Sequence, residues 1–258
     1  EFGFISAWRS AGHGKILMGF SHSTVRYWDL RYFFDPRGYT HTGKNDLPIP
    51  DYIGVNGSVM KNSYINGDYP QERLIEVEAL RYLHLCNSPT SQIKNNKNRL
   101  QARTLLVVGD YLKENTGKQL ALLMAAFKDI DQSIRYIIKP HPACPINMQD
   151  LPGLNFEIST QPIGELLLIS DVVYSSSTTS AAVDAYCAGK SVITILDGRS
   201  LNLSPLRGVG GVYFVSNAKE LVIAINGAGV NELEKMEDYF YLDIGLPRWK
   251  KWLTDERC

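Results

Sequence analysis

Two stretches of the sequence are decisive for the fold: Tyr136-Ile-Ile-Lys-Pro-His-Pro142 and Val172-Val-Tyr-Ser-Ser-Ser-Thr-Thr179. Each is an apolar, strand-like run that ends abruptly in small polar or cyclic residues. Continuous apolar strands are typical of a parallel sheet that is covered on both faces. Ligands bind outside the carboxyl ends of such strands. The two stretches therefore predict a parallel α/β sheet with a ligand site where the runs stop.

The same alternation of apolar runs and helical spacing continues from residue 102 to about residue 230. This pattern predicts a doubly wound α/β domain. The expected strands are 104–108, 134–138, 155–158, 171–174, 191–196 and 211–215. The expected helices are 116–130, 163–169 and 179–188, and the last of these ends at Gly189, a residue type typical of the position after a helix.

The first hundred residues are less regular. We expect strands over 16–20 and 51–56, and the spacing of apolar residues predicts an amphipathic helix over 70–83, with Glu78 as a surface charge. A polar, Asn-rich segment over 87–103 is typical of a linker. The predicted domains are a partial N-terminal acceptor-side α/β domain (1–100), a C-terminal nucleotide-sugar-binding Rossmann-like domain (101–231) and C-terminal helices that pack back toward the first domain (232–258).

Composition excludes several classes of function. Lys plus Arg and Asp plus Glu both number 27, so no net charge favours a nucleic-acid partner. No apolar run approaches the roughly 18–20 residues that span a bilayer. The 4 cysteines lie far apart without CxxC spacing, and no HExxH motif occurs, so neither a metal nor a disulfide framework is indicated. We expect a cytoplasmic protein.

The Lys139-Pro-His-Pro142 segment is the first candidate for chemistry. Two prolines restrict the backbone around His141, and its imidazole at the end of a strand is able to donate to a phosphate oxygen or to act as acid or base. Lys139 adds a positive charge. The alternative is that the prolines simply make a rigid turn.

The second candidate is the row of hydroxyls Ser175, Ser176, Ser177 and Thr178. Hydroxyls before a helix are able to cap it and to bind an anion at its N-terminus. Capping alone is the alternative, but it needs only one of them. Asp184, inside the following helix, either accepts from ribose hydroxyls or is an ordinary solvated helix charge.

Other candidates follow neighbouring strands. Gly109 and Asp110 end the first strand of the predicted C-terminal domain, where glycine permits close approach of the backbone to a ligand. Arg199 and Arg207 follow a later strand and are able to clamp a carboxylate or phosphate. For each arginine alone, a surface charge on a loop is the alternative.

In the first half, His22, Arg26 and Asp29 lie in a dense mixture of polar and aromatic residues after the first expected strand. This mixture could line an acceptor or sugar pocket. A packed aromatic cluster with satisfied polar groups explains it equally well.

The two strand ends resemble the His-Pro and Ser/Thr motifs of bacterial sialyltransferases and Kdo transferases, and Asp184-Ala…Gly189-Lys-Ser-Val-Ile193 looks like the Glu-Ala-x-x-x-Gly-x-Pro-Val-Ile element of that fold. The resemblance implies a GT-B-like fold of two Rossmann-like domains, the N-terminal one partial. It implies transfer of a nonulosonic or Kdo-type sugar from a CMP-sugar donor to a glycan acceptor of the bacterial surface, at the inner face of the membrane, without a cofactor. His141 would assist departure of the donor phosphate, and Ser175 to Thr178 would hold it.

These families carry a catalytic carboxylate on the N-terminal domain, and residues 1–100 show no clear match to that motif. Either the base lies upstream of this chain, or Asp29 or Asp110 serves. Two alternatives stay open: a GT-B transferase that uses a UDP- or GDP-sugar, and a non-catalytic sugar-nucleotide-binding module, including an epimerase-like fold.

Overall fold

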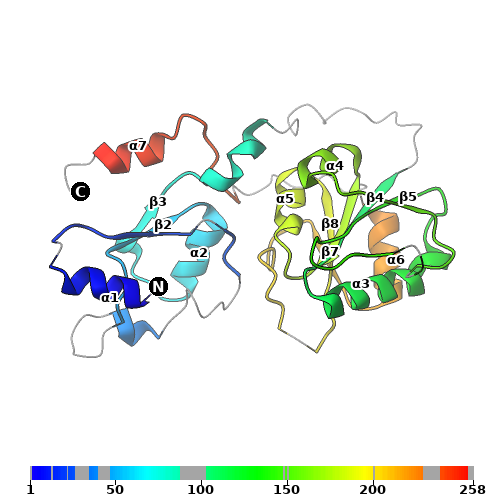
Figure 1. Ribbon diagram of the computed structural model, residues 1–258, viewed down its shortest axis with the longest axis horizontal. Coiled ribbons are helices and arrows are strands. Elements are labelled where there is room, and N and C mark those ends of the chain that lie inside the picture. The colour runs from blue at the N-terminus through cyan, green and yellow to red at the C-terminus, as the bar shows by residue number, and fades with distance from the viewer. Residues whose placement is uncertain are drawn as a thin grey trace. The chain divides into compact units, whose positions relative to one another are not determined.

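The chain forms two compact units in the computed structural model (Figure 1). Unit 1 comprises Glu1–Ser88 and Glu237–Cys258, and unit 2 comprises Pro89–Met236. The structure describes residues 2–12, 14–21, 23–26, 35–39, 47–87, 103–147, 149, 151–199, 201–228 and 239–254. The C-terminal segment therefore returns to the unit that contains the N-terminus.

Unit 2 contains a sheet of six parallel strands within the described ranges, in the order β6-β5-β4-β7-β8-β9. The strands are β4 (Thr104–Val108), β5 (Arg135–Lys139), β6 (Phe156–Ile158), β7 (Val172–Ser176), β8 (Ser191–Ile195) and β9 (Val212–Val215). All residues of β4 and β7 are buried, as expected for central strands covered on both faces.

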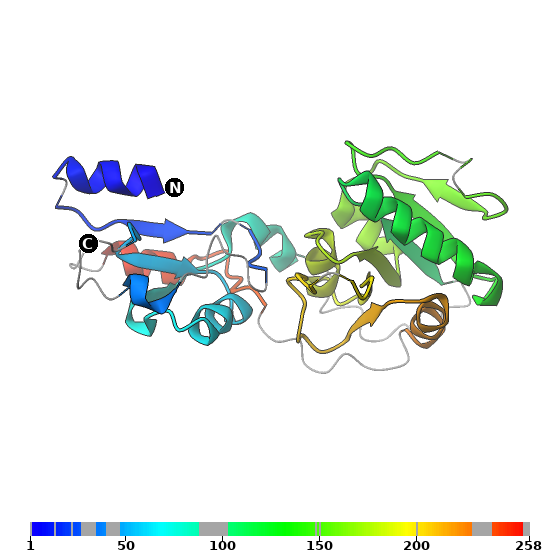
Figure 2. The same cartoon turned by 90° about the horizontal axis from the view of Figure 1, so that it is seen from below.

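Helices cover both faces of this sheet. They are α3 (Lys113–Ala126), α4 (Ile163–Ile169), α5 (Ala181–Cys187) and α6 (Ala218–Gly227). The helices α3 and α6 pack together on one face, and α4 and α5 pack together on the other; Figure 2 shows α3 lying along the strands. On the α3 side, the alternate residues Leu105, Val107 and Tyr174 join Leu123 in one buried core.

The expected end of the helix before β8 is confirmed. The helix α5 stops at Cys187, and Gly189 adopts a φ of 69°. Its N–H donates to the Tyr186 carbonyl (2.9 Å), and the next N–H, that of Lys190, donates to the Ala185 carbonyl (3.0 Å). A residue with a Cβ atom is strained in this left-handed conformation, so glycine is the residue that lets the chain turn directly into β8.

Unit 1 contains a three-stranded parallel sheet in the part of the chain that the structure describes, in the order β1-β2-β3. Its strands are β1 (Met18–Phe20), β2 (Tyr52–Val55) and β3 (Leu74–Glu76), and its helices are α1 (Phe2–Ser10), α2 (Ser58–Asn66) and α7 (Pro247–Thr254), with short 3₁₀ helices at Pro36–Tyr39, Gln71–Arg73 and Leu80–Asn87.

The predicted amphipathic helix over 70–83 is wrong. A 3₁₀ turn, the strand β3 and a second 3₁₀ helix occupy this range. The strand pairs with β2, with Ile75 opposite Gly54. The side chain of Val77, just after β3, is fully buried. Pairing with β2 overrides the helical spacing, because a short apolar run fits either structure.

Glu78 is consequently not a surface charge, because its side chain is fully buried. Its carboxylate accepts hydrogen bonds from the backbone N–H groups of Arg248 (2.9 Å) and Trp249 (3.1 Å) in the first turn of α7. The Trp249 indole N–H donates to the Glu78 carbonyl (3.0 Å). The positive end of a helix stabilises a carboxylate in this position, so Glu78 anchors the C-terminal helix to the end of β3.

The segment before α7 is also built into unit 1. The Tyr241 N–H donates to the Asn56 carbonyl after β2, and the Tyr241 carbonyl accepts from the Ala79 N–H after β3. A Cβ atom at Gly57 would lie 1.8 Å from the Tyr239 carbonyl oxygen. Only glycine permits this approach, so Gly57 is the place where the returning chain meets the start of α2.

Across the described residues, no helix has both the length and the apolar character to cross a membrane.

Replacing Glu78 by Ala should lower the free energy of unfolding of unit 1 by about 3 kcal/mol, because it removes a buried acceptor and leaves helix N–H groups unpaired. The matched control is Glu72→Ala, which removes an exposed glutamate of the 3₁₀ helix before β3 and should cost less than about 1 kcal/mol. All 4 tryptophans, Trp8, Trp28, Trp249 and Trp252, belong to unit 1. Urea unfolding followed by tryptophan fluorescence therefore reports this unit, and equal losses for the two variants would contradict the anchor.

Candidate functional site

The candidate site lies at the carboxyl edge of the unit 2 sheet, where the strand order reverses. From β4 the sheet grows through β5 and β6 on one side and through β7, β8 and β9 on the other. A ligand crevice is expected outside the carboxyl ends of the two strands that flank such a reversal, here β4 and β7. Gly109 and Asp110 follow β4, and Ser177 and Thr178 follow β7, so the structure brings these predicted residues to one place.

The Asp110 carboxylate joins the two strand ends. It accepts hydrogen bonds from the hydroxyls of Ser176, a short contact, and of Thr178 (3.0 Å) on the β7 side. On its own side it accepts from the Leu112 N–H (2.9 Å) and the Asn115 amide (3.3 Å). The side chain is 2% exposed. Asp110 therefore links the loop after β4 to the loop after β7.

Burial alone would raise the pKa of the Asp110 carboxyl, but the hydrogen bonds from Leu112, Ser176, Thr178 and Asn115 outweigh it and hold the pKa below its ordinary value. An acid that is stabilised in its ionised form is a weak proton acceptor. The geometry therefore favours a positioning role for Asp110 over the predicted role of catalytic base.

The predicted row of hydroxyls divides into groups with different roles. Ser176 and Thr178 donate to Asp110. Ser175 is fully buried, and its hydroxyl has no hydrogen-bond partner among the described residues; the same is true of Thr194, its register partner on β8. Ser177 is half-buried in the turn after β7. Anion binding by the whole row stays a prediction, and the turn that leads into α5 is the part of the row that is most accessible to a ligand.

His141 lies exposed just after β5, next to the site. Its Nδ1 atom accepts a hydrogen bond from the Ala143 N–H (3.1 Å), and its carbonyl accepts from the Cys144 N–H (2.8 Å). The Tyr111 ring meets the imidazole edge to face, with 6.2 Å between ring centroids. Since Nδ1 is an acceptor, the neutral ring carries its proton on Nε2, and this N–H is the donor that His141 offers to a ligand.

Lys139 and Gly109 fix the backbone beside His141. The Gly109 N–H donates to the Lys139 carbonyl (3.0 Å), which holds the ends of β4 and β5 together. A Cβ atom at Gly109 would lie 3.4 Å from the backbone nitrogen of His141, an ordinary contact distance. The Lys139 ammonium donates to the Gln161 carbonyl (2.5 Å) in the loop between β6 and α4. Its charge is thus directed toward that loop.

The remaining predicted residues are more scattered. Asp184 is half-buried on α5, and Arg199 and Arg207 are exposed in the connection between β8 and β9. Arg26 is half-buried in unit 1, after β1. His22 and Asp29 lie outside the described residues, so the predicted acceptor pocket and the catalytic role of Asp29 stay predictions.

Gln119 of α3 is not among the predicted site residues, yet it connects the two strands of the reversal. Its side-chain amide donates to the carbonyls of Val108 on β4 (3.1 Å) and Tyr174 on β7 (3.0 Å), and the side chain is fully buried. Thr116, one turn earlier, exchanges hydrogen bonds with the Asp110 backbone (3.0 Å). Both share a helical face with Leu123, and two polar residues on an apolar face were the signal that could have revealed them.

Within the described ranges, no group of three or more His, Cys, Asp or Glu side chains is placed to hold a metal ion. Ligand binding without a metal or cofactor stays a prediction.

Comparison with protein-family models finds no match, and comparison with curated protein sequences finds none. Solved structures do match. The Methanocaldococcus jannaschii UDP-GlcNAc 2-epimerase, in complex with UDP-GlcNAc and UDP, is 13% identical with a TM-score of 0.63, covering 98% of this chain and 72% of that one. The Staphylococcus aureus MnaA–UDP structure gives 12% identity, a TM-score of 0.59 and coverages of 97% and 69%.

The Neisseria meningitidis UDP-GlcNAc 2-epimerase bound to UDP-GlcNAc is 15% identical with a TM-score of 0.55, over 86% of this chain and 64% of that one. At these identities the likeness shows the fold alone. It confirms the predicted GT-B-like α/β fold with two Rossmann-like domains and parallel sheets. The predicted CMP-sugar donor stays a prediction.

Replacing Asp110 by Asn should lower the stability of unit 2 by about 2 kcal/mol at neutral pH, because the hydroxyl donors lose a charged acceptor. The pKa of Asp110 is depressed from 3.8 in the folded chain, so its contribution is complete above the unfolded value and is lost as pH falls through the folded one. The difference between wild type and variant should therefore shrink below about pH 4.

Urea unfolding followed by circular dichroism at several pH values measures this difference. The control is Asp129→Asn, which changes an exposed aspartate in the 3₁₀ turn after α3 and should have little effect at any pH. A loss in Asp110→Asn that stays constant down to pH 3 would contradict an ionised Asp110.

Proposed function

We propose that the protein binds a nucleotide-sugar, with the nucleotide at the carboxyl edge of β4 and β7, and that it processes a UDP-sugar. The observation that carries this proposal is the strand reversal between β4 and β7, at which Asp110, Ser176 and Thr178 are joined by hydrogen bonds. The fold likeness to proteins solved with UDP or UDP-GlcNAc supports the same ligand class.

The diphosphate would lie between His141 and the turn that leads into α5. In this arrangement the Nε2–H of His141 donates to a phosphate oxygen, because Nδ1 is already occupied by the Ala143 N–H. Ser177 and the backbone of the turn supply further donors. The buried Asp110 carboxylate would repel a phosphate at close range, so the phosphates lie outside it and Asp110 holds the loop in shape.

Two further roles follow from position. Asp184 on α5 would accept from a ribose hydroxyl, and the exposed guanidinium groups of Arg199 and Arg207 would neutralise the diphosphate. Both arginines lie in the connection that follows β8, the strand next to β7.

A second candidate is the predicted transferase that uses a CMP-sugar for bacterial surface glycans. The arrangement of Lys139-Pro-His-Pro142 favours it, since a preorganised imidazole donor suits a leaving group on which charge develops. A nucleoside monophosphate would occupy the same edge, with one phosphate instead of two.

We expect UDP to raise the unfolding temperature of the protein by roughly 5–10 °C at a hundred times its Kd. His141→Ala should weaken UDP binding about tenfold through loss of one donor to a charged group. The matched control is His84→Ala, because His84 is an exposed histidine of unit 1. Calorimetric titration with UDP, CMP, CDP and GDP tests the ligand class. Tighter binding of CMP than of UDP would favour the CMP-sugar transferase. Failure of all four nucleotides to bind would contradict both the UDP-sugar and the CMP-sugar proposals.

The reaction itself is tested with the intact protein and UDP-GlcNAc, followed by proton NMR. We expect conversion of UDP-GlcNAc to a product with the opposite configuration at C2, the reaction that the names of the structurally similar enzymes state. Release of CMP from a CMP-sugar in the presence of glycan would instead support a transferase. Tight UDP binding without any turnover would favour the non-catalytic module.

A further inference from the structure

Tyr111 is the one exposed tyrosine, phenylalanine or tryptophan of unit 2, among the residues that the structure describes. It follows β4 and Asp110, at the edge of the sheet where we propose that the nucleotide binds. The residue is 54% exposed. Single exposed apolar residues are common on protein surfaces, so the place and the neighbours of Tyr111 decide whether it has a role.

A hydrogen bond and a ring contact hold Tyr111 at this edge. The N–H of the next residue, Leu112, donates to the buried Asp110 carboxylate (2.9 Å), which fixes the backbone on both sides of Tyr111. The Tyr111 ring lies edge to face against the exposed imidazole of His141, with 6.2 Å between ring centroids. The ring is therefore placed beside the proposed phosphate donor and is still accessible to a ligand.

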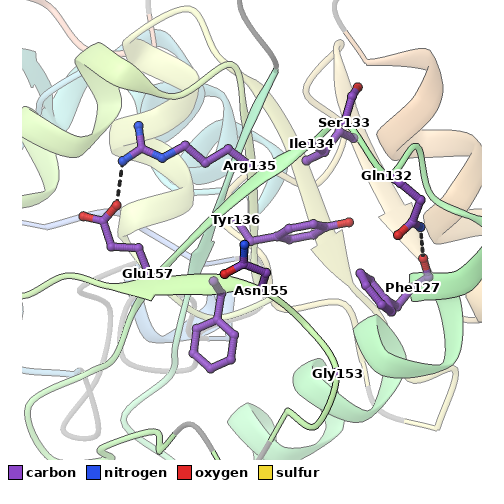
Figure 3. Close-up of a pocket in the computed structure, with 10 residues that line it drawn as sticks. Phe127, Gln132, Ser133, Ile134, Arg135, Tyr136, Gly153, Asn155 and Glu157 are labelled. Atoms are coloured by element: carbon purple, nitrogen blue, oxygen red, sulfur yellow. Dashed lines mark hydrogen bonds and ion pairs between the residues drawn. The ribbon is translucent and has the colours of Figure 1, made fainter.

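The hollow at the opposite edge of the same sheet, beside the amino ends of β5 and β6, offers no such ring (Figure 3). Polar side chains that line it already have partners there. Arg135 pairs with Glu157 at 2.6 Å, as the dashed line in Figure 3 marks. The Gln132 amide donates to the Phe127 carbonyl at 3.0 Å. The ring of Tyr136, which also lines the hollow, is 4% exposed. The accessible ring of unit 2 thus lies at the nucleotide edge.

The proposed nucleotide site sets the direction in which a ligand runs across this edge. Asp184, which we propose accepts from the ribose, lies on α5, the helix that follows β7. Tyr111 and His141 follow β4 and β5, on the other side of the strand reversal. With the diphosphate between the two sides, the nucleoside lies toward α5. The group attached to the second phosphate then lies toward Tyr111.

A pyranose ring suits an exposed aromatic ring in this position. Its axial C–H groups form an apolar face, and its hydroxyls lie around the rim. The C–H groups carry partial positive charge and meet the negative face of an aromatic ring favourably, while the hydroxyls at the rim stay in water. A phosphate has no such apolar face. Contact with the Tyr111 ring is therefore available to a ligand that carries a sugar and not to the diphosphate alone.

We propose that Tyr111 determines specificity at the nucleotide edge by stacking on the apolar face of the pyranose that the nucleotide carries. The inference rests on the proposed function and deepens it, because it assigns the sugar half of the ligand to the loop after β4. Through this contact the protein distinguishes a nucleotide-sugar from the free nucleotide.

Calorimetric titration of the intact protein with UDP and with UDP-GlcNAc tests the proposal, because UDP lacks the sugar. Tyr111→Ala should weaken binding of UDP-GlcNAc about fivefold and change binding of UDP by less than about twofold. Tyr111→Phe keeps the ring and should bind both ligands like the wild type. The matched control is Leu112→Ala, which truncates the adjacent exposed side chain and should leave both affinities unchanged. All three variants should keep the unfolding temperature of the wild type.

Proton NMR of bound UDP-GlcNAc supplies a second readout. The ring current of residue 111 should move the pyranose C–H signals upfield in the wild type and in Tyr111→Phe, but not in Tyr111→Ala. Equal weakening of UDP and UDP-GlcNAc by Tyr111→Ala would show that the ring supports His141 or the base, and would overturn the sugar contact. Unchanged affinity for both ligands, or an equal loss in Leu112→Ala, would overturn it as well. Failure of the wild type to bind UDP would instead contradict the proposed function, and the sugar contact with it.

Discussion

The Asp110 carboxylate takes hydrogen bonds from both sides of the strand reversal in unit 2, and the candidate site depends on this link. The loops that follow two strands at such a reversal run in different directions. The backbone hydrogen bonds between the strands therefore do not continue into the loops. The Asp110 carboxylate connects the two loops by hydrogen bonds beyond the sheet. The Gln119 amide connects the two strands themselves, at carbonyls near their carboxyl ends. Because both groups are buried, opening this edge would leave a charge or an amide unpaired. Opening this edge of the sheet therefore costs free energy.

Unit 1 also contains a buried carboxylate that connects the end of a strand to a neighbouring segment. Glu78 follows the last strand of its sheet, and its buried carboxylate receives the N–H groups at the start of α7. The indole of Trp249 packs against Phe20 of β1, with ring centroids 5.2 Å apart. Without this anchor, a helix of eight residues would be marginal in water. In both units a buried acid after a strand fixes a neighbouring segment, and neither acid is arranged as a free proton acceptor.

The spacing of apolar residues predicted the secondary structure of unit 2 well and that around residue 75 poorly. The strands of unit 2 are continuous apolar runs bounded by glycine and polar residues, and such runs have few alternative structures. The range 70–83 mixes a short apolar run with charged residues, and its strand exists only because β2 lies beside it. Long-range pairing of this kind leaves no mark in local spacing. The same holds for the candidate site. The ends of the strands were enough to predict which residues lie there, but the hydrogen bonds from Ser176 and Thr178 to Asp110 join residues 66 or more positions apart.

Those contacts change what the row of hydroxyls is able to do. A hydroxyl has one proton, and Ser176 and Thr178 give theirs to Asp110. They are then acceptors toward any further group, and a phosphate has no proton to offer them at neutral pH. A phosphate at this edge must be held by other donors: the Nε2–H of His141, the residues of the turn before α5, or cations from the connection after β8. The spacing between these donors and Asp110 thus sets where the charged part of a ligand lies, and it leaves the carboxylate to shape the loop instead of touching the phosphate.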